Sequence, residues 1–211
     1  MIVGTTNPNK LREIAAICMP LGVFIDYRSL DVPETETSFE GNARLKALGY
    51  SAQFPSQYVL VEDSGLVVPA LHGLPGPWSA RFDDLDISTK EIVETKRPRE
   101  VIDLANNKKV LSLLDGVAFE QRGAYFVICL NIARHDEILF TATCKRHGWI
   151  ATEMRGTNGF GYDPIFIGQD TFGKTYAEID SHRKNLRSHR NEALKQLEVW
   201  LSDQVKRGVS L

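Results

Sequence analysis

Two adjacent carboxylates, Glu62 and Asp63, are the residues of this chain best suited to acid–base or metal chemistry. They follow the apolar run 58–61 and precede Ser64 and Gly65. A short apolar run closed by a turn signal is typical of a buried strand. We therefore expect the acids just beyond a strand, where open α/β sheets bind ligands. Because side chains alternate along a strand, one acid would face a cleft while backbone donors or a basic partner hold the other. Such acids suit Mg²⁺, which takes one or two carboxylates and completes its shell with water and phosphate oxygens. A solvated turn after an ordinary strand is the alternative.

Composition limits the class of protein. The chain has 211 residues, of which 43% are apolar, enough for one domain with a sizeable core. Its net charge of -2 provides no overall field for nucleic acid, so we expect no polymeric nucleic-acid partner and only a local anion site. The three cysteines have neither metal nor disulfide spacing and are expected to be buried thiols in a reducing compartment. With no signal peptide and no apolar run long enough to cross a bilayer, the sequence predicts a soluble, cytoplasmic protein without a membrane partner.

The N-terminal segment predicts an anion site. A strand at 2–4 is followed by the polar segment 5–10 and by apolar residues at helical spacing over 11–18. The first N–H groups of a helix and its dipole favour negative charge, and Lys10 adds a cation. The Gly-x-x-x-x-Gly-Lys frame of a P-loop is absent. The alternative is a capped helix with a surface lysine.

A second cation lies on the next expected helix, 39–50, which follows an acidic loop. One face of this helix is expected to be apolar and is marked by Phe39, Ala43, Ala47 and Tyr50. Asn42 and Lys46 are four residues apart and share another face. If that face lines a cleft, Lys46 can meet phosphate, and Glu34 or Glu36 can supply a second carboxylate for the metal. A solvated helix after a charged loop would look the same.

Two glycine-rich loops are further candidates for function. The loop 72–82 has glycines and prolines around Trp78, and with Phe82 this residue could pack against a second subunit. In 155–166, glycines flank Phe160 and free the backbone to approach a ligand closely. The ring could stack on a base, a contact worth roughly 1–3 kcal/mol in nucleic-acid systems. An ordinary turn with a buried aromatic is the alternative.

Between these loops we expect a helix over 106–114 and two strands, 123–133 and 138–145, joined as a hairpin. An antiparallel pair makes the sheet mixed, so a pure dinucleotide-binding fold is not expected.

The last segment is basic and leads into an amphipathic helix over 192–205, with Ser188 as its N-cap. His189 and Arg190 would lie in the first turn, where cations oppose the helix dipole. That placement favours a ligand that compensates it, although solvated charge would also explain it.

Taken in order, these motifs resemble the Ham1 family, the inosine triphosphate pyrophosphatases that clear dITP, ITP and XTP. The matching blocks are Thr5-x-Asn7-x-x-Lys10, Phe39-x-x-Asn42-Ala43-x-x-Lys46-Ala47, Glu62-Asp63-Ser64-Gly65-Leu66, Gly73-x-Pro75-Gly76, Gly159-Phe160-Gly161-Tyr162-Asp163-Pro164-x-Phe166 and Lys184-x-x-x-Ser188-His189-Arg190. They span nearly the whole chain.

The resemblance implies a single domain over 1–211 with an α/β fold: an elongated mixed β-sheet flanked by helices, with two lobes and a nucleotide cleft between them. It also implies a homodimer. The implied reaction is hydrolysis of deaminated purine nucleoside triphosphates to the monophosphate and pyrophosphate, with Mg²⁺ required, which protects nucleotide pools.

The resemblance also implies roles for individual residues. Asp63 would be the catalytic carboxylate and a metal ligand. Pro33-Glu34-Thr35-Glu36 stands where relatives often have paired glutamates, so the second ligand is Glu34 or Glu36, with Glu34 preferred. His72 stands where relatives usually have glycine. The substrate-binding residues implied are Thr5, Thr6, Asn7, Pro8, Asn9, Lys10, Lys46, Ser64, Phe160, Gly161, Tyr162, Asp163, Lys184, His189 and Arg190.

In the implied mechanism Asp63 deprotonates a water for attack at phosphorus, while Mg²⁺ and lysines neutralise the triphosphate. His189 and Arg190 would donate to the 6-oxo group of the base, which adenine lacks.

Two alternatives remain open. A Maf-like pyrophosphatase would act on dTTP or UTP, but its Ser-x-Ser-x-x-Arg opening is absent. A non-catalytic nucleotide sensor would not need Asp63 beside Ser64.

Overall fold

Six strands form one mixed sheet in the order β2-β1-β3-β4-β5-β6 in this computed structural model, which describes residues 1–5, 8–92, 96–209 and 211 and not the side chains of 8, 9 and 181. The strands are β1 (Ile2–Gly4), β2 (Asp26–Arg28), β3 (Val59–Val67), β4 (Gly123–Arg134), β5 (Glu137–Ile150) and β6 (Phe166–Gly168). The α-helices are α1 (Pro8–Cys18), α2 (Phe39–Gln53), α3 (Arg99–Leu113), α4 (Ser181–Leu186) and α5 (His189–Lys206). β1 pairs in parallel with β2 and β3, whereas β5 pairs antiparallel with β6. The expected mixed α/β sheet is confirmed.

The chain divides into two compact units. Unit 1 consists of Met1–Asp63, Ile128–Cys144 and His189–Leu211, and unit 2 of Ser64–Val127 and Lys145–Ser188. β3, β4 and β5 each contribute residues to both units. The single domain expected over 1–211 stays a prediction.

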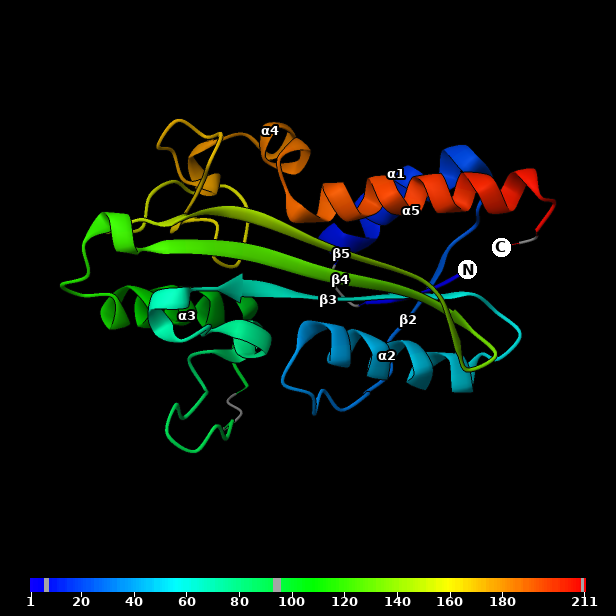
Figure 1. Ribbon diagram of the computed structural model, residues 1–211, viewed down its shortest axis with the longest axis horizontal. Coiled ribbons are helices and arrows are strands. Elements are labelled where there is room, and N and C mark those ends of the chain that lie inside the picture. Colours follow the sequence, from blue (N-terminus) through cyan, green and yellow to red (C-terminus); the bar gives the residue numbers. More distant parts are fainter. Residues whose placement is uncertain (6–7, 93–95, 210) are drawn as a thin grey trace. The chain divides into compact units, whose positions relative to one another are not determined.

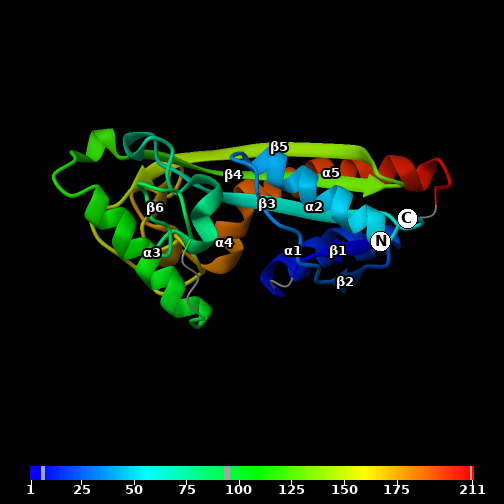
Figure 2. The same cartoon turned by 90° about the horizontal axis from the view of Figure 1, so that it is seen from below.

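In unit 1, helices cover both faces of the sheet (Figure 1). Val3 and Leu60 pack with residues of α1 and α5, whereas Ile2 and Val59 pack with residues of α2. These neighbours in sequence point to opposite faces because side chains alternate along a strand. The short strands β1 and β2 lie beside α1 (Figure 2). Unit 1 thus has the three-layer arrangement typical of an α/β fold.

α2 forms where the sequence predicts it. Ser38 is its N-cap: the backbone N–H of Gly41 donates to Ser38 Oγ at 3.0 Å. The predicted apolar face, which includes Ala43 and Ala47, is buried. The helix is therefore fixed against the sheet, and this fixes the position of Lys46.

β3 differs from the prediction in a way that matters for the site. The expected strand ended before Glu62 and Asp63, but β3 continues to Val67. Leu66 is fully buried in the core of unit 2, so the apolar pattern resumes after the acids and keeps the chain extended. The two acids consequently lie within a strand rather than in a turn beyond it.

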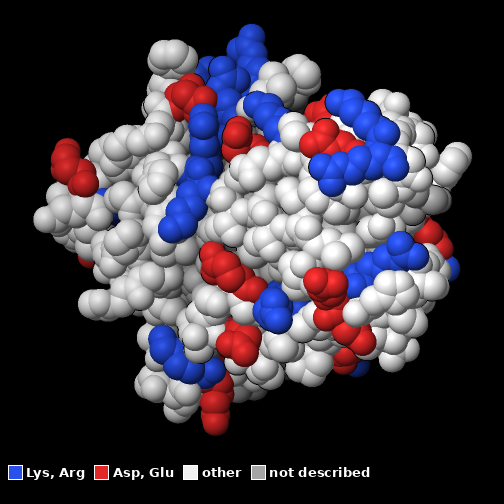
Figure 3. All heavy atoms as spheres, turned by 45° about the vertical axis from the view of Figure 1, so that its right-hand side comes forward, with Lys and Arg blue, Asp and Glu red and all other residues white. Residues whose placement is uncertain are grey.

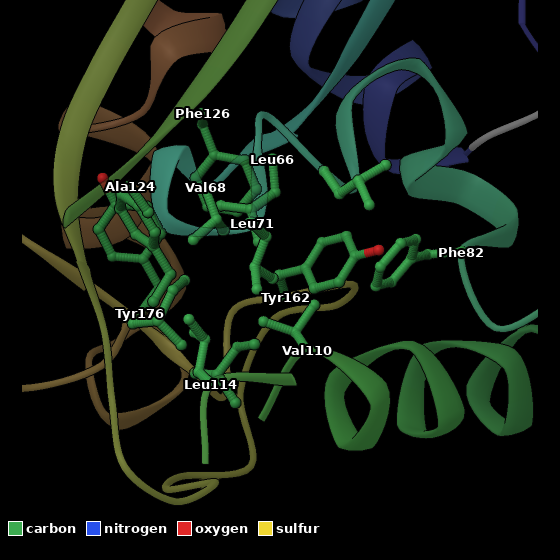
Figure 4. Packing of buried hydrophobic residues seen from close by; sticks show 14 of the residues in the cluster. Leu66, Val68, Leu71, Phe82, Val110, Leu114, Ala124, Phe126, Tyr162 and Tyr176 are labelled. Carbon is green, nitrogen blue, oxygen red and sulfur yellow. The ribbon is translucent and has the colours of Figure 1, made fainter. Parts of the chain in front are cut away.

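The core of unit 2 gathers side chains from β3, α3, β4, β5, β6 and the loops between them (Figure 4). Phe126 and Phe166 have ring centroids 4.5 Å apart, and Tyr176 packs on Phe166 at 5.0 Å. Phe82 is fully buried in this core. The expectation that Phe82 packs against a second subunit is therefore wrong, because its ring completes the fold of its own chain.

The predicted hairpin is confirmed, with slightly longer strands. His135 and Asp136 connect β4 to β5, and both have positive φ, as a two-residue type I′ turn requires.

The predicted helix over 106–114 is longer than expected because α3 begins at Arg99, directly after Pro98. His72 has a φ of 54°, in the left-handed region that glycine adopts without strain. The chain therefore keeps at His72 the conformation that a glycine would favour.

The three cysteines are free and buried, as predicted. In the parts of the chain that the structure describes, every helix is too short or too polar to span a membrane.

Candidate functional site

Glu62 is the acceptor in a buried ion network of unit 1. Lys10 Nζ lies 2.8 Å from Glu62 Oε1, and Arg190 approaches the same carboxylate with Nε at 3.1 Å and Nη2 at 3.0 Å. Arg190 Nη1 also lies 3.3 Å from Glu13 Oε2. Burial alone would raise the pKa of Glu62, but Arg190 and Lys10 outweigh it and hold the pKa well below its ordinary value. Glu62 is therefore a permanent anion that orients two cations.

Asp63 points to the opposite face of β3 and has different partners. Lys46 Nζ lies 3.3 Å from Asp63 Oδ1 and 2.8 Å from Glu34 Oε1. Burial raises the pKa of Asp63, and nearby Glu34 raises it further against the opposing effect of Lys46. For Lys46, burial lowers the pKa, but Asp63 and Glu34 outweigh it, so the net pKa is raised. Asp63 is thus a stronger base than an ordinary aspartate.

The conformation of the loop before α2 determines which acidic side chain lies beside Asp63. The backbone N–H of Glu36 donates to Asn42 Oδ1 at 3.0 Å, and Asn42 is buried. Asn42 therefore fixes the acidic loop, a role that the sequence did not predict. Within this fixed loop it is Glu34 that pairs with Lys46 beside Asp63.

The residues present fit Mg²⁺ held by few protein ligands. Asp63 Oδ2 is buried and has no hydrogen-bond partner among the described residues. A buried carboxylate oxygen without a partner is costly unless a ligand satisfies it. In the described ranges, no group of three or more His, Cys, Asp or Glu side chains could hold a metal, so a cation at Asp63 would take few protein ligands. A carboxylate pair such as Asp63 and Glu34, completed by water and phosphate, is the donor set that Mg²⁺ takes in nucleotide sites.

In unit 2, Asp163 holds the predicted glycine-rich loop 155–166 in place. Asp163 Oδ2 accepts a hydrogen bond from the backbone N–H of Phe160 at 2.9 Å and pairs with Lys184 Nζ at 2.9 Å. The ammonium of Lys184 also lies over the Phe160 ring, 4.5 Å from its centroid. Gly159 has a φ of 78°, and a Cβ there would collide with Asp163 Oδ2. The loop thus presents a half-buried aromatic ring with a cation on it.

The side chain of Tyr162 has a structural role. It is buried in the core of unit 2 (Figure 4). Its hydroxyl donates to Ser79 O at 2.8 Å. Burial raises its pKa well above the ordinary tyrosine value. A substrate contact at Tyr162 would have to use its backbone.

The other predicted site residues are placed as follows. Thr6 and Asn7 lie outside the described residues, and only the backbone of Pro8 and Asn9 is described, as the start of α1. Thr5 follows β1, Ser64 follows Asp63 in β3, and His189 is the buried first residue of α5.

Sequence reasoning missed residues that orient the predicted ones. Glu13 binds Arg190 across a separation of 177 residues, and Asp103 and Asn107 of α3 bind the backbone of Gly161. The available signals were spacings: Glu13 lies three residues after Lys10, and Asp103 lies four before Asn107. These spacings place residues on one helix face but do not name the partner.

Known proteins match this chain over nearly its whole length. The model of the Ham1 family matches residues 1–200. A dITP/XTP pyrophosphatase of Halalkalibacterium halodurans is 39% identical over 207 residues, covering 95% of this chain and 97% of that protein. The dITP/XTP pyrophosphatase of Streptococcus mutans is also 39% identical, over 93% of this chain, but the match spans only 58% of that longer protein.

A solved structure of a HAM1 protein from Coxiella burnetii has the same fold, with a TM-score of 0.78 at 30% identity, covering 96% of this chain and 98% of that one. Family model, sequence relatives and fold agree over nearly the entire length. This chain belongs to the Ham1 family.

Proposed function

We propose that this chain is a nucleoside triphosphate pyrophosphatase that hydrolyses the deaminated purine nucleotides ITP, dITP and XTP to the monophosphate and pyrophosphate. Relatives covering more than nine-tenths of the chain are dITP/XTP pyrophosphatases by name. The observation that carries the proposal is Asp63, a buried carboxylate with one partnerless oxygen among the described residues and a lysine at its other oxygen. That combination suits activation of water beside a triphosphate.

Asp63 acts as the general base. It takes the proton from the attacking water as the new bond to the α-phosphorus forms and the bond from the α-phosphorus to the bridging oxygen breaks, which releases pyrophosphate. Lys46 holds the carboxylate in place and neutralises its charge until substrate arrives. Mg²⁺ held by Asp63 and Glu34 supplies charge neutralisation at the phosphates when it is bound.

The cations of the site bind phosphate oxygens. Lys10 lies in the first turn of α1, where helix N–H groups and the dipole favour anions. Its charge also reaches Asp63, whose pKa it lowers slightly. In unit 2, Lys184 is held by Asp163 and supplies a further cation. Thr5 to Asn9 and Ser64 complete the phosphate contacts in this proposal.

Base selectivity rests on stacking and on oriented donors. Phe160 stacks on the purine, and His189 and Arg190 donate to its 6-oxo group. The guanidinium of Arg190 is held by Glu62 and Glu13, so its direction is fixed before a base binds. Sites that depend on such pairing discriminate by roughly 10⁴–10⁵, because the wrong base leaves buried donors unpaired. ATP, with an amine at this position, should be a poor substrate.

The working protein is proposed to be a cytoplasmic homodimer that requires Mg²⁺ and protects nucleotide pools from deaminated purines. Its buried free thiols fit a reducing compartment.

The test is pyrophosphate release from ITP, dITP, XTP, GTP, ATP, dTTP and UTP, each with Mg²⁺ or with a chelator. We expect the first three to be hydrolysed only with Mg²⁺, with ITP and ATP differing by several orders of magnitude in kcat/KM. Preference for dTTP or UTP would instead indicate a Maf-like activity. Saturable ITP binding without turnover would indicate a nucleotide sensor, and either result would overturn the proposal.

A further inference from the structure

α3 buries two adjacent asparagines, Asn106 and Asn107, each only 1% exposed. Consecutive residues on a helix point about 100° apart, so the two amides serve different neighbours. Asn106 accepts a hydrogen bond from Asp83 N at 2.7 Å and donates to Ser79 O at 3.2 Å. It thereby fixes the last part of the loop 72–82 and the residue that follows it. Asn107 faces a different part of unit 2.

Asn107 and Asp103 lie one helical turn apart and both bind the backbone of Gly161, the first at its carbonyl oxygen and the second at its N–H group. Asn107 Nδ2 donates to Gly161 O at 2.7 Å, and Gly161 N donates to Asp103 Oδ2 at 2.9 Å. Asp103 is itself held by Arg99, whose Nε lies 2.8 Å from Asp103 Oδ1. Gly161 directly follows Phe160 and has a φ of 62°. The direction of the Phe160 ring therefore depends on this attachment to α3.

The Asn107 amide is oriented so that its NH₂ group binds the loop, at the expense of the hydrogen bonding of its own oxygen. Its Nδ2 reaches two carbonyls, Gly161 O and Asp103 O, while its Oδ1 is buried with no partner among the described residues. Burying an acceptor without a partner is unfavourable, and an apolar residue of similar size would avoid it. Packing alone thus does not account for an asparagine at this position.

We propose that Asp103 and Asn107 are positioning residues that hold the Phe160 ring in the plane that a purine stacks on, and so determine affinity for the base. This rests on the function proposed above. Stacking on the ring is the same before and during reaction at phosphorus, so loosening the loop should raise KM and leave kcat nearly unchanged. Lys184, the phosphate cation of this unit, is paired with Asp163 and not with Gly161, so affinity for the phosphates alone should change little.

The test compares Asn107→Leu, which keeps the volume but removes the donor, with Lys108→Gln, an exposed neighbour on α3. Wild-type turnover of ITP with Mg²⁺ is measured first, because its absence would defeat the proposed function and not this inference. We expect Asn107→Leu to raise the KM for ITP about tenfold, with kcat within about twofold, as the loss of hydrogen bonds of ordinary strength predicts. Inhibition by inorganic tripolyphosphate should be the same in wild type, Asn107→Leu and Lys108→Gln.

Should Asn107→Leu fail to fold, Gly161→Ala tests the same attachment. A Cβ at Gly161 meets no atom within 4 Å, so only the strained φ perturbs the loop. A folded Asn107→Leu or Gly161→Ala variant with unchanged KM for ITP would overturn the inference. So would a parallel weakening of tripolyphosphate inhibition, because that would indicate a general structural defect.

Discussion

Glu62 and Asp63 are neighbours in sequence with opposite acid–base properties. Glu62 is kept ionised by Arg190 and Lys10, whereas burial raises the pKa of Asp63. Paired carboxylates whose environments separate their pKa values commonly divide structural and catalytic roles. Here the permanent anion orients cations, and the more basic carboxylate is the one proposed to accept a proton.

The first prediction concerns Asp63→Asn. The substitution preserves shape but removes the base, so we expect nucleotide binding close to that of wild type and a loss of turnover of at least about 10²-fold. Calorimetric ITP binding and pyrophosphate release measure the two effects separately. Near-normal turnover in this variant would exclude Asp63 as the base.

A second prediction concerns stability and pH. In Glu62→Gln the buried Arg190 loses its main partner, so at neutral pH the free energy of unfolding should fall by about 3 kcal/mol. The pKa of Glu62 is lower in the folded chain than its ordinary value of 4.5, so the ionised carboxylate stabilises the fold above that pH. As the pH falls from about 4.5 towards the much lower pKa of the folded state, the contribution is lost progressively, and the difference between wild type and variant should shrink.

Denaturant unfolding at several pH values measures this difference. The control is Glu192→Gln, whose partner Lys195 is an exposed residue at 3.8 Å. A surface pair contributes about 0–1 kcal/mol, so this control should resemble wild type throughout. A difference between wild type and Glu62→Gln that does not depend on pH would contradict the role given to the ionised carboxylate.

At the scale of elements, the loop around Phe160 depends on a close approach of side chain to backbone. Gly159 and Gly173 have the same φ of 78°, but a Cβ would collide with Asp163 only at Gly159. The two positions therefore separate backbone strain from steric collision within one unit.

The third prediction follows from that pair. Gly173→Ala should destabilise by strain alone, on the order of 1 kcal/mol. Gly159→Ala should lose about 1–3 kcal/mol more, because the collision displaces Asp163, and should also raise the KM for ITP. Thermal unfolding and steady-state kinetics of both variants check this; equal effects would mean that Asp163 does not fasten the loop.

At the scale of the whole molecule, positive and negative charges nearly cancel. The net charge is -2, and on the face shown in Figure 3 a run of basic side chains has acidic side chains beside it. Polymeric nucleic acid binds through extended phosphate contacts, which need a broad basic surface. A mononucleotide needs only local cations such as Lys46.

The fourth prediction is that Asp63→Asn, which is expected to bind nucleotide without turnover, retains ITP but not single-stranded DNA at physiological salt. Fluorescence anisotropy with a labelled oligonucleotide and with a labelled ITP analogue measures both under the same conditions. Saturable, salt-sensitive oligonucleotide binding would show that local cations suffice for a polymer and would contradict this expectation.

The amino-acid sequence by itself determined which chemistry is available and much of the local structure. The spacing around Ala43 and Ala47 predicted the buried face of α2, and polar residues between apolar runs predicted the β4–β5 hairpin. Such features follow from local periodicity and turn propensity, which neighbouring residues set. The motifs around Asp63 and Phe160, taken in order, also indicated the family.

Tertiary structure decided the partners of those residues. The sequence predicted that Glu62 and Asp63 face opposite ways, but it ended β3 too early, since two acids resemble a turn. Packing of Leu66 in the core instead keeps the strand extended through both acids. Arg190 reaches Glu62 across 128 residues, and Asn107 reaches Gly161 across 54. Burial and charged neighbours set a pKa, and both depend on such long-range packing, which local spacing does not encode.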